Sequence, residues 1–148
     1  MNNLIQVDKC GFGIEVEEVA HPTLVLGYVK VRFDKEIIGS DEEPYVVYPI
    51  LKTLKGVSKN IKNFNCKDLF DESAIKCWEE LSYSEKYKLA NIEFLDRYNM
   101  RVTSKENVLR FLWKNSDGSN DLYDFKVDLD DYRYVVNEVC KLMNFEDL

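Results

Sequence analysis

The sequence has a single histidine and only four cysteines, which leaves few ways to build a reactive site. One imidazole excludes metal sites that need two or more histidines, and any nucleophile–histidine pair would have to use His21. That residue precedes Pro22 between two expected strands, where a turn or surface histidine is far commoner than a catalytic one. No two cysteines form a Cys-x-x-Cys pair and their spacing fits no zinc pattern, so reduced thiols are expected.

Other signals are missing as well. The glycines form no phosphate-binding loop, because Gly11-Phe12-Gly13 has neither a third glycine nor a following helix. The first residues show no basic stretch followed by an apolar run, so no secretory signal is expected. The longest apolar stretch, residues 45–51, is far too short to cross a bilayer and contains Pro49. We therefore expect a cytoplasmic protein with no cofactor and no membrane contact.

The composition predicts one soluble domain spanning residues 1–148. The chain is 45% hydrophobic and 32% charged, and a chain of this length buries a core without disulfides or metals. Its net charge of −7 repels nucleic acid and anionic membranes and attracts basic protein partners. The same moderate charge also serves solubility alone, so by itself it identifies no partner.

The clearest pattern runs from Val108 to Met143 and predicts strand, turn, strand, helix. Apolar residues alternate over residues 108–114 and again over 122–128, separated by turn-forming residues 115–121. A stripe at helical spacing follows. The first strand presents Leu109, Phe111 and Trp113, the second presents Tyr123, Phe125 and Val127, and the stripe is Leu129, Tyr132, Val135, Val136, Val139, Leu142 and Met143.

The N-terminal part predicts further strands over residues 4–7, 12–17 and 23–33, then a short one ending at Gly39. Glu15 and Glu17 are expected to face Lys30 and Arg32 across the central hairpin.

The middle of the chain predicts helices. One covers residues 45–57, although Pro49 favours a start at Tyr48 or Pro49 itself. Another begins at Asp71 or Ser73 with Ile75, Trp78 and Leu81 on one side, and residues 82–85 resemble a capping box for a helix toward Tyr98. The predicted fold class is therefore α+β, a single domain with an antiparallel β-sheet and helices packed on one face.

Two arrangements of acidic residues suggest metal chemistry, and both have simpler interpretations. Asp124-Phe125-Lys126 on a strand matches the acid-x-Lys of metal-dependent nucleases, but the second carboxylate would have to be Asp117 or Asp121. Those two, with Ser119 and Asp128, also occupy positions of a calcium loop, yet Leu122 stands where glycine is needed. Turns select the same residues, so we assign no catalytic residue and no metal ligand.

Six aspartates lie between positions 117 and 131, and three of them open the final helix. Carboxylates there stabilise the positive end of the helix dipole. The set as a whole is also expected to form an acidic surface.

This layout resembles the small immunity proteins of bacterial toxin–immunity systems, including those of contact-dependent growth inhibition. The resemblance is carried by the opening hairpin, residues 11–17 and 29–39, and by the closing strands and helix over 111–113, 123–127 and 129–143. It implies a cytosolic protein without enzymatic activity that binds and neutralises the C-terminal toxin domain of a large delivered protein. Such toxins are often nucleases with a basic groove, which an acidic surface would match.

On that resemblance we place the partner contact at Asp117, Asp121, Asp124, Asp128, Asp131 and Tyr134. The alternatives are a metal-dependent nuclease-like hydrolase and a generic protein-interaction or regulatory domain.

Overall fold

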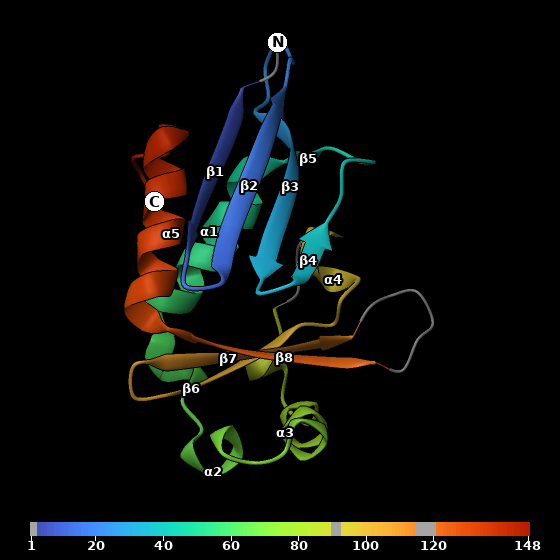
Figure 1. Cartoon of the computed structure of the whole chain (residues 1–148), viewed down its shortest axis with the longest axis vertical. Helices are drawn as coiled ribbons and strands as arrows, with labels where there is room; N and C mark the ends of the chain where they lie inside the picture. The colour runs from blue at the N-terminus through green and yellow to red at the C-terminus, as the bar shows by residue number, and fades with distance from the viewer. Residues whose placement is uncertain (1–2, 90–92, 115–120) are drawn as a thin grey trace. The chain divides into compact units, whose positions relative to one another are not determined.

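The computed structural model describes residues 3–89, 93–114 and 121–148, and its elements are drawn in Figure 1. The chain divides into two compact units. Unit 1 contains residues 1–58 and 130–148, and unit 2 contains residues 59–129. Each unit combines an antiparallel sheet with helices, which confirms the predicted α+β class. That all 148 residues act as one domain stays a prediction.

The sheet of unit 1 has the strand order β1-β2-β3-β4, and β5 pairs with β3. Its strands are β1 (Leu4–Lys9), β2 (Phe12–Val19), β3 (Leu26–Phe33), β4 (Glu36–Gly39) and β5 (Tyr45–Val46). Cys10 and Gly11 both have positive φ, as a two-residue hairpin between β1 and β2 requires. The predicted strand starting at residue 23 begins at Leu26 instead, because His21 and Pro22 hold the preceding residues in a turn.

One face of this sheet is apolar and is covered by α1 (Val47–Lys59) and α5 (Leu129–Leu142) (Figure 1). Phe12, Ile14 and Val16 of β2 are buried, and so are the alternate residues of β3, as their period of two predicts. Tyr132 of α5 stacks on Phe12 with ring centroids 4.9 Å apart and donates a hydrogen bond to the Leu54 carbonyl. Burial raises the pKa of the Tyr132 hydroxyl. The helices of unit 1 thus pack on one face of its sheet.

The prolines and glycines of unit 1 have specific places. Pro49 is the third residue of α1, where a missing N–H costs nothing because first-turn amides have no helical acceptor. Residues 45 and 46 are extended, as Pro49 suggested. Gly27 pairs regularly with Glu18 and Tyr45 and forms no bulge. The predicted stripe of α5 is buried except for Leu142, which is exposed at the last turn.

Unit 2 contains a sheet of order β6-β7-β8 and several short helical turns. Its elements are η1 (Ile61–Phe64), α2 (Lys67–Phe70), α3 (Ala74–Leu81), η2 (Glu85–Tyr87), α4 (Glu93–Asp96), β6 (Arg101–Lys105), β7 (Val108–Lys114) and β8 (Leu122–Asp128). The bounds of β7 and β8 agree with the alternation in the sequence. Their register pairs Leu109 with Val127, Phe111 with Phe125 and Trp113 with Tyr123, so the two predicted faces coincide. The connecting residues 115–120 lie outside the described residues.

The helical segments of unit 2 are shorter than the sequence suggests. Ser73 caps α3 as expected, accepting a hydrogen bond from the backbone N–H of Lys76 at 3.4 Å. Trp78 and Leu81 are buried, but Ile75 is 65% exposed and was wrongly assigned to the inner side. Ser84 caps only the three-residue η2, so the capping box does not begin a long helix. Among the described residues, none of the helices has both the length and the apolar character needed to span a bilayer.

Candidate partner-binding surface

The predicted acidic contact residues do not gather at one point. Asp121 and Asp128 are exposed and flank opposite ends of β8, which separates them by roughly 24 Å along the strand. Asp117 lies outside the described residues. Asp131 belongs to unit 1, whereas Asp124 lies on β8 in unit 2. Their role in binding stays a prediction.

Asp124 is held by a buried arginine of the neighbouring strand. The Arg110 guanidinium donates through Nε and Nη2 to the two carboxylate oxygens of Asp124, at 2.9 and 2.8 Å. Its Nη1 donates to the Phe70 and Glu72 carbonyls, both at 2.7 Å. This bidentate hydrogen bond raises the pKa of Arg110. Arg110 therefore neutralises the charge of Asp124 and joins the end of α2 to the sheet.

The contacts of Asp124 also determine whether it can serve the acid-x-Lys site considered in the sequence analysis. Both oxygens of Asp124 are engaged by Arg110, and the Lys126 ammonium lies 5.2 Å from the centre of the Phe70 ring. In the part of the chain that the structure describes, no three His, Cys, Asp or Glu side chains are arranged to hold a metal ion.

Asp131 and Tyr134 share Lys9 as a neighbour within unit 1. The Lys9 Nζ lies 3.3 Å from the Asp131 carboxylate and 5.1 Å from the centre of the Tyr134 ring. Tyr134 is 48% exposed, as an aromatic anchor for a partner requires. Asp131 is mostly covered and its charge is paired, so it offers less to a partner than its position in the sequence suggests.

The two units carry very different net charges. Unit 1 has 14 acidic and 8 basic side chains, a net charge of −6, whereas unit 2 has 13 and 12, a net charge of −1. The aspartates singled out in the sequence mostly belong to unit 2. The difference in net charge between the units can be counted only after the fold assigns residues 130–148 to the same unit as residues 1–58.

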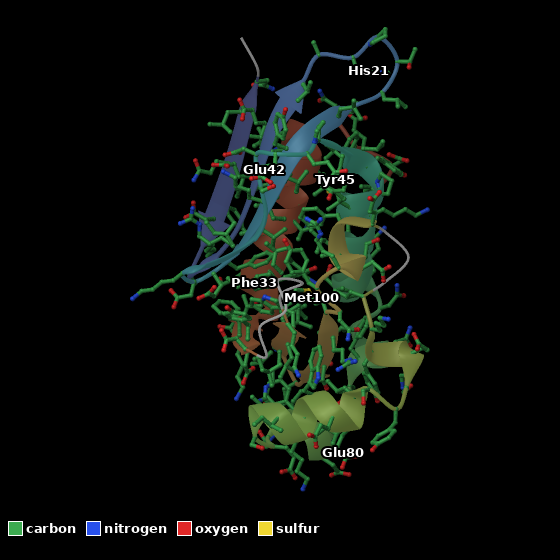
Figure 2. All side chains as sticks on the ribbon, turned by 90° about the vertical axis from the view of Figure 1, so that its right-hand side faces the viewer. His21, Phe33, Glu42, Tyr45, Glu80 and Met100 are labelled. Atoms are coloured by element: carbon green, nitrogen blue, oxygen red, sulfur yellow. The ribbon has the colours of Figure 1, made fainter. Side chains whose placement is uncertain are left out.

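The uncovered face of the unit 1 sheet lies opposite α1 and α5, and we call it the outer sheet face. It combines acidic, aromatic and apolar side chains in rows that follow the strand register. Its residues are Leu4, Gln6, Asp8, Gly13, Glu15, Glu17, Val19, Leu26, Tyr28, Lys30, Arg32, Ile37 and Val46, with Asp41, Glu42 and Glu43 along its β4–β5 edge. Figure 2 labels Glu42 and Tyr45 at this edge.

Lys30 ties the acidic edge to the outer sheet face. Its Nζ lies 3.0 Å from Asp41 and 3.5 Å from Glu15. The hydrogen bond to Asp41 is the main reason that the pKa of Lys30 is raised. Glu15 pairs with Lys30 as the sequence predicted, but Glu17 faces Tyr28 instead of a cation. The one central cation of this face is therefore shared by two carboxylates.

A shallow hollow lies on the outer sheet face above Gly13, between Asp8, Glu15, Lys30 and Arg32. A Cβ at Gly13 would lie 2.7 Å from the Cβ of Asp8, so only glycine leaves this space open. The hollow presents carboxylates on one side and cations on the other, which suits a polar side chain from a partner.

Unit 2 has its own exposed apolar side chains near the two ends of α3. Tyr83, two residues after α3, is 86% exposed, and Ile75 near the start of the same helix is 65% exposed. Exposed glutamates accompany them, and Figure 2 labels Glu80 among them. The sequence analysis assigned Ile75 to the core because only its spacing was considered.

His21 has a structural role in the turn before β3. Its Nδ1 accepts hydrogen bonds from the backbone N–H groups of Thr23 and Leu24, at 3.2 and 3.0 Å. The ring is exposed, as Figure 2 shows.

The fold is that of a bacterial immunity protein of known structure. The crystal structure of CdiI from Burkholderia dolosa AUO158 matches with a TM-score of 0.74, covering 93% of this chain and 99% of that chain. The two sequences are only 12% identical, so this similarity establishes the fold. No curated protein matches the chain.

The family follows from the sequence itself. A family model described as immunity protein 42 matches residues 7–141, which is nearly the whole chain. The chain therefore belongs to the immunity protein 42 family, and the resemblance drawn from its layout is confirmed.

Proposed function

We propose that this chain binds the C-terminal toxin domain of a larger delivered protein and blocks it in the cytosol. It acts as a stoichiometric inhibitor without catalytic activity of its own. Membership of an immunity protein family supports an inhibitory role. The contact-dependent growth inhibition context is proposed by analogy with the similar CdiI fold.

The observation that carries the proposal further is the net charge of −6 on unit 1. A nuclease must hold the phosphates of its substrate with basic side chains. A protein with an excess of carboxylates on a folded surface matches such a groove and associates with it quickly. We therefore propose a nuclease as the toxin.

Co-expression tests this proposal. Where a gene for a large protein with a toxic C-terminal domain adjoins the gene of this chain, that domain is expressed in bacteria with and without the chain, and survival is scored. We expect growth only when both are present, and equimolar chain should abolish nucleic-acid cleavage by the purified toxin domain. Death in both cultures would contradict the immunity function.

A control addresses the alternative of a metal-dependent hydrolase. The purified chain alone is incubated with DNA or RNA and Mg²⁺. We expect intact nucleic acid, because Arg110 already occupies both oxygens of Asp124. Cleavage that disappears in the Asp124→Asn variant would replace the inhibitor proposal with an enzymatic one.

A further inference from the structure

We infer that the toxin binds the outer sheet face of unit 1, and that the toxin surface seated there is basic with an exposed apolar patch. The inference rests on the proposed function, since it names the part of the chain that the toxin contacts. Three properties of this face carry it: apolar exposure, charge and rigidity.

Apolar side chains cross the outer sheet face at one end. Strand pairing aligns Val19, Leu26 and Val46 in one row, in which Val19 and Leu26 are half-buried and Val46 is 39% exposed. Leu4 on β1 is 56% exposed and pairs with Glu17. Contiguous exposed apolar side chains on a folded surface mark an interaction site more often than scattered ones do.

The charge on this face defines the partner. Six carboxylates, those of Asp8, Glu15, Glu17, Asp41, Glu42 and Glu43, accompany only two cations, Lys30 and Arg32. Lys30 is already shared between Glu15 and Asp41. The excess of negative charge next to an apolar row complements lysines or arginines that surround an apolar anchor.

The face is also rigid. Apart from Asp41, Glu42 and Glu43, which lie in the β4–β5 connection, its side chains stand on regular strands. The opposite faces of these strands are packed against α1 and α5 through buried residues such as Val16, Val29 and Val31. A surface of this kind loses little conformational entropy on binding. The exposed group around Tyr83 is different, because it follows a helix of only eight residues in a unit of balanced charge.

Charge-reversal pairs test the location while holding the change in net charge constant. Glu42→Lys/Glu43→Lys alters the outer sheet face. Glu79→Lys/Glu80→Lys makes the same change on α3 of unit 2, and Asp121→Lys/Asp128→Lys makes it at the two ends of β8. Affinity for the purified toxin domain encoded beside this chain is measured by surface plasmon resonance, and thermal unfolding verifies that each variant is folded.

We expect the Glu42/Glu43 pair to weaken binding by about tenfold or more, partly through faster dissociation, and the other two pairs to change it by less than about threefold. Equal losses in all three variants would mean that total charge and not this face governs binding. A loss confined to the Asp121/Asp128 pair would move the contact to β8. Either result overturns the inference.

A second comparison tests the exposed apolar side chains of the outer sheet face without changing the charge of any carboxylate. Leu4→Asp lies on the outer sheet face, and Leu142→Asp makes the same change at a similarly exposed position, 52%, on α5. Leu4→Asp should weaken binding about tenfold and Leu142→Asp should leave it unchanged. Equal affinities of both variants would overturn the inference. If the wild-type chain neither binds nor protects, the proposed function itself fails; if it protects and only these placements fail, the function stands.

Discussion

Unit 1 and unit 2 use their charged residues in opposite ways. Unit 1 has longer strands and helices, an apolar core and a surplus of carboxylates at its surface. Unit 2 is built from short helical turns and one sheet, its charges nearly balance, and two of its arginines are buried. Charge in unit 2 therefore contributes to folding, whereas charge in unit 1 remains available to a partner.

The two buried arginines show how unit 2 joins segments that have little regular structure. Arg110 connects Asp124 to the carbonyls of Phe70 and Glu72. Arg101 lies with its guanidinium 3.7 Å from the centre of the Trp78 ring and donates to the Trp78 carbonyl at 3.3 Å. Burial lowers the pKa of Arg101. Arg110 thus satisfies two backbone carbonyls at and just after the end of α2. Arg101 adds a second donor to the Trp78 carbonyl, which also accepts from the backbone N–H of Ser82 at the end of α3.

The largest expected effect is the loss of Arg110. Arg110→Met should lower the free energy of unfolding by about 3 kcal/mol, because it removes four hydrogen bonds and leaves Asp124 unpaired. Urea unfolding measures the change. Arg32→Met makes the same replacement at an exposed strand position of unit 1 and should change stability by less than about 0.5 kcal/mol. Similar losses of unfolding free energy in the two variants would contradict the claim that charged residues contribute more to folding in unit 2 than in unit 1.

A smaller effect is expected where unit 1 packs its sheet against α1. A Cβ at Gly27 would lie 2.9 Å from Val16 Cγ1, 3.1 Å from the Glu17 carbonyl oxygen and 3.2 Å from Val47 Cγ2 of α1. Gly27→Ala should therefore destabilise the protein by about 1–3 kcal/mol in urea unfolding.

Gly56 in α1 is the matched control, since a Cβ there would meet nothing within 4 Å. Gly56→Ala should stabilise the protein by about 0.4–1 kcal/mol, because alanine restricts the unfolded chain and favours the helix. A neutral Gly27→Ala variant would show that the sheet and α1 can move apart without cost.

The smallest effect concerns an exposed ion pair of unit 2. The hydrogen bond from Lys105 lowers the pKa of Asp71. A lowered folded pKa means that the pair contributes stability above the unfolded pKa of aspartate and loses it as the pH falls through the folded value. Asp71→Asn should thus have a slightly lower Tm than the wild type at neutral pH and an equal Tm below pH ~2. A difference that persists in acid would contradict this origin.

Much of the fold follows from local patterns. The alternation over β7 and β8 predicts their bounds and the residues that share one face, because apolar side chains specify one face of each strand. The predicted secondary structure is less accurate from residue 58 to residue 98, where Arg101 and Arg110 hold short helical turns through hydrogen bonds to backbone carbonyls. Such tertiary hydrogen bonds produce no regular spacing of apolar residues, so the sequence pattern does not reveal them.

The proposed binding surface is harder to predict from the sequence than the fold is. Counting neighbouring aspartates singles out Asp124, whose charge is neutralised by an arginine 14 residues earlier. The outer sheet face draws its carboxylates from two strands and a loop, so they are scattered in the sequence and brought together only by strand pairing. The immunity function itself came from the layout of the chain and is carried by no single residue.

Hydrogen exchange with and without the bound toxin domain tests most directly whether unit 1 is the binding unit. In the complex, we expect slower amide exchange in peptides that cover residues 39–46 and in β1 at the edge of the unit 1 sheet. Peptides that cover residues 74–83 and 121–128 should change little. Protection confined to those segments of unit 2, with unit 1 unaltered, would contradict the account.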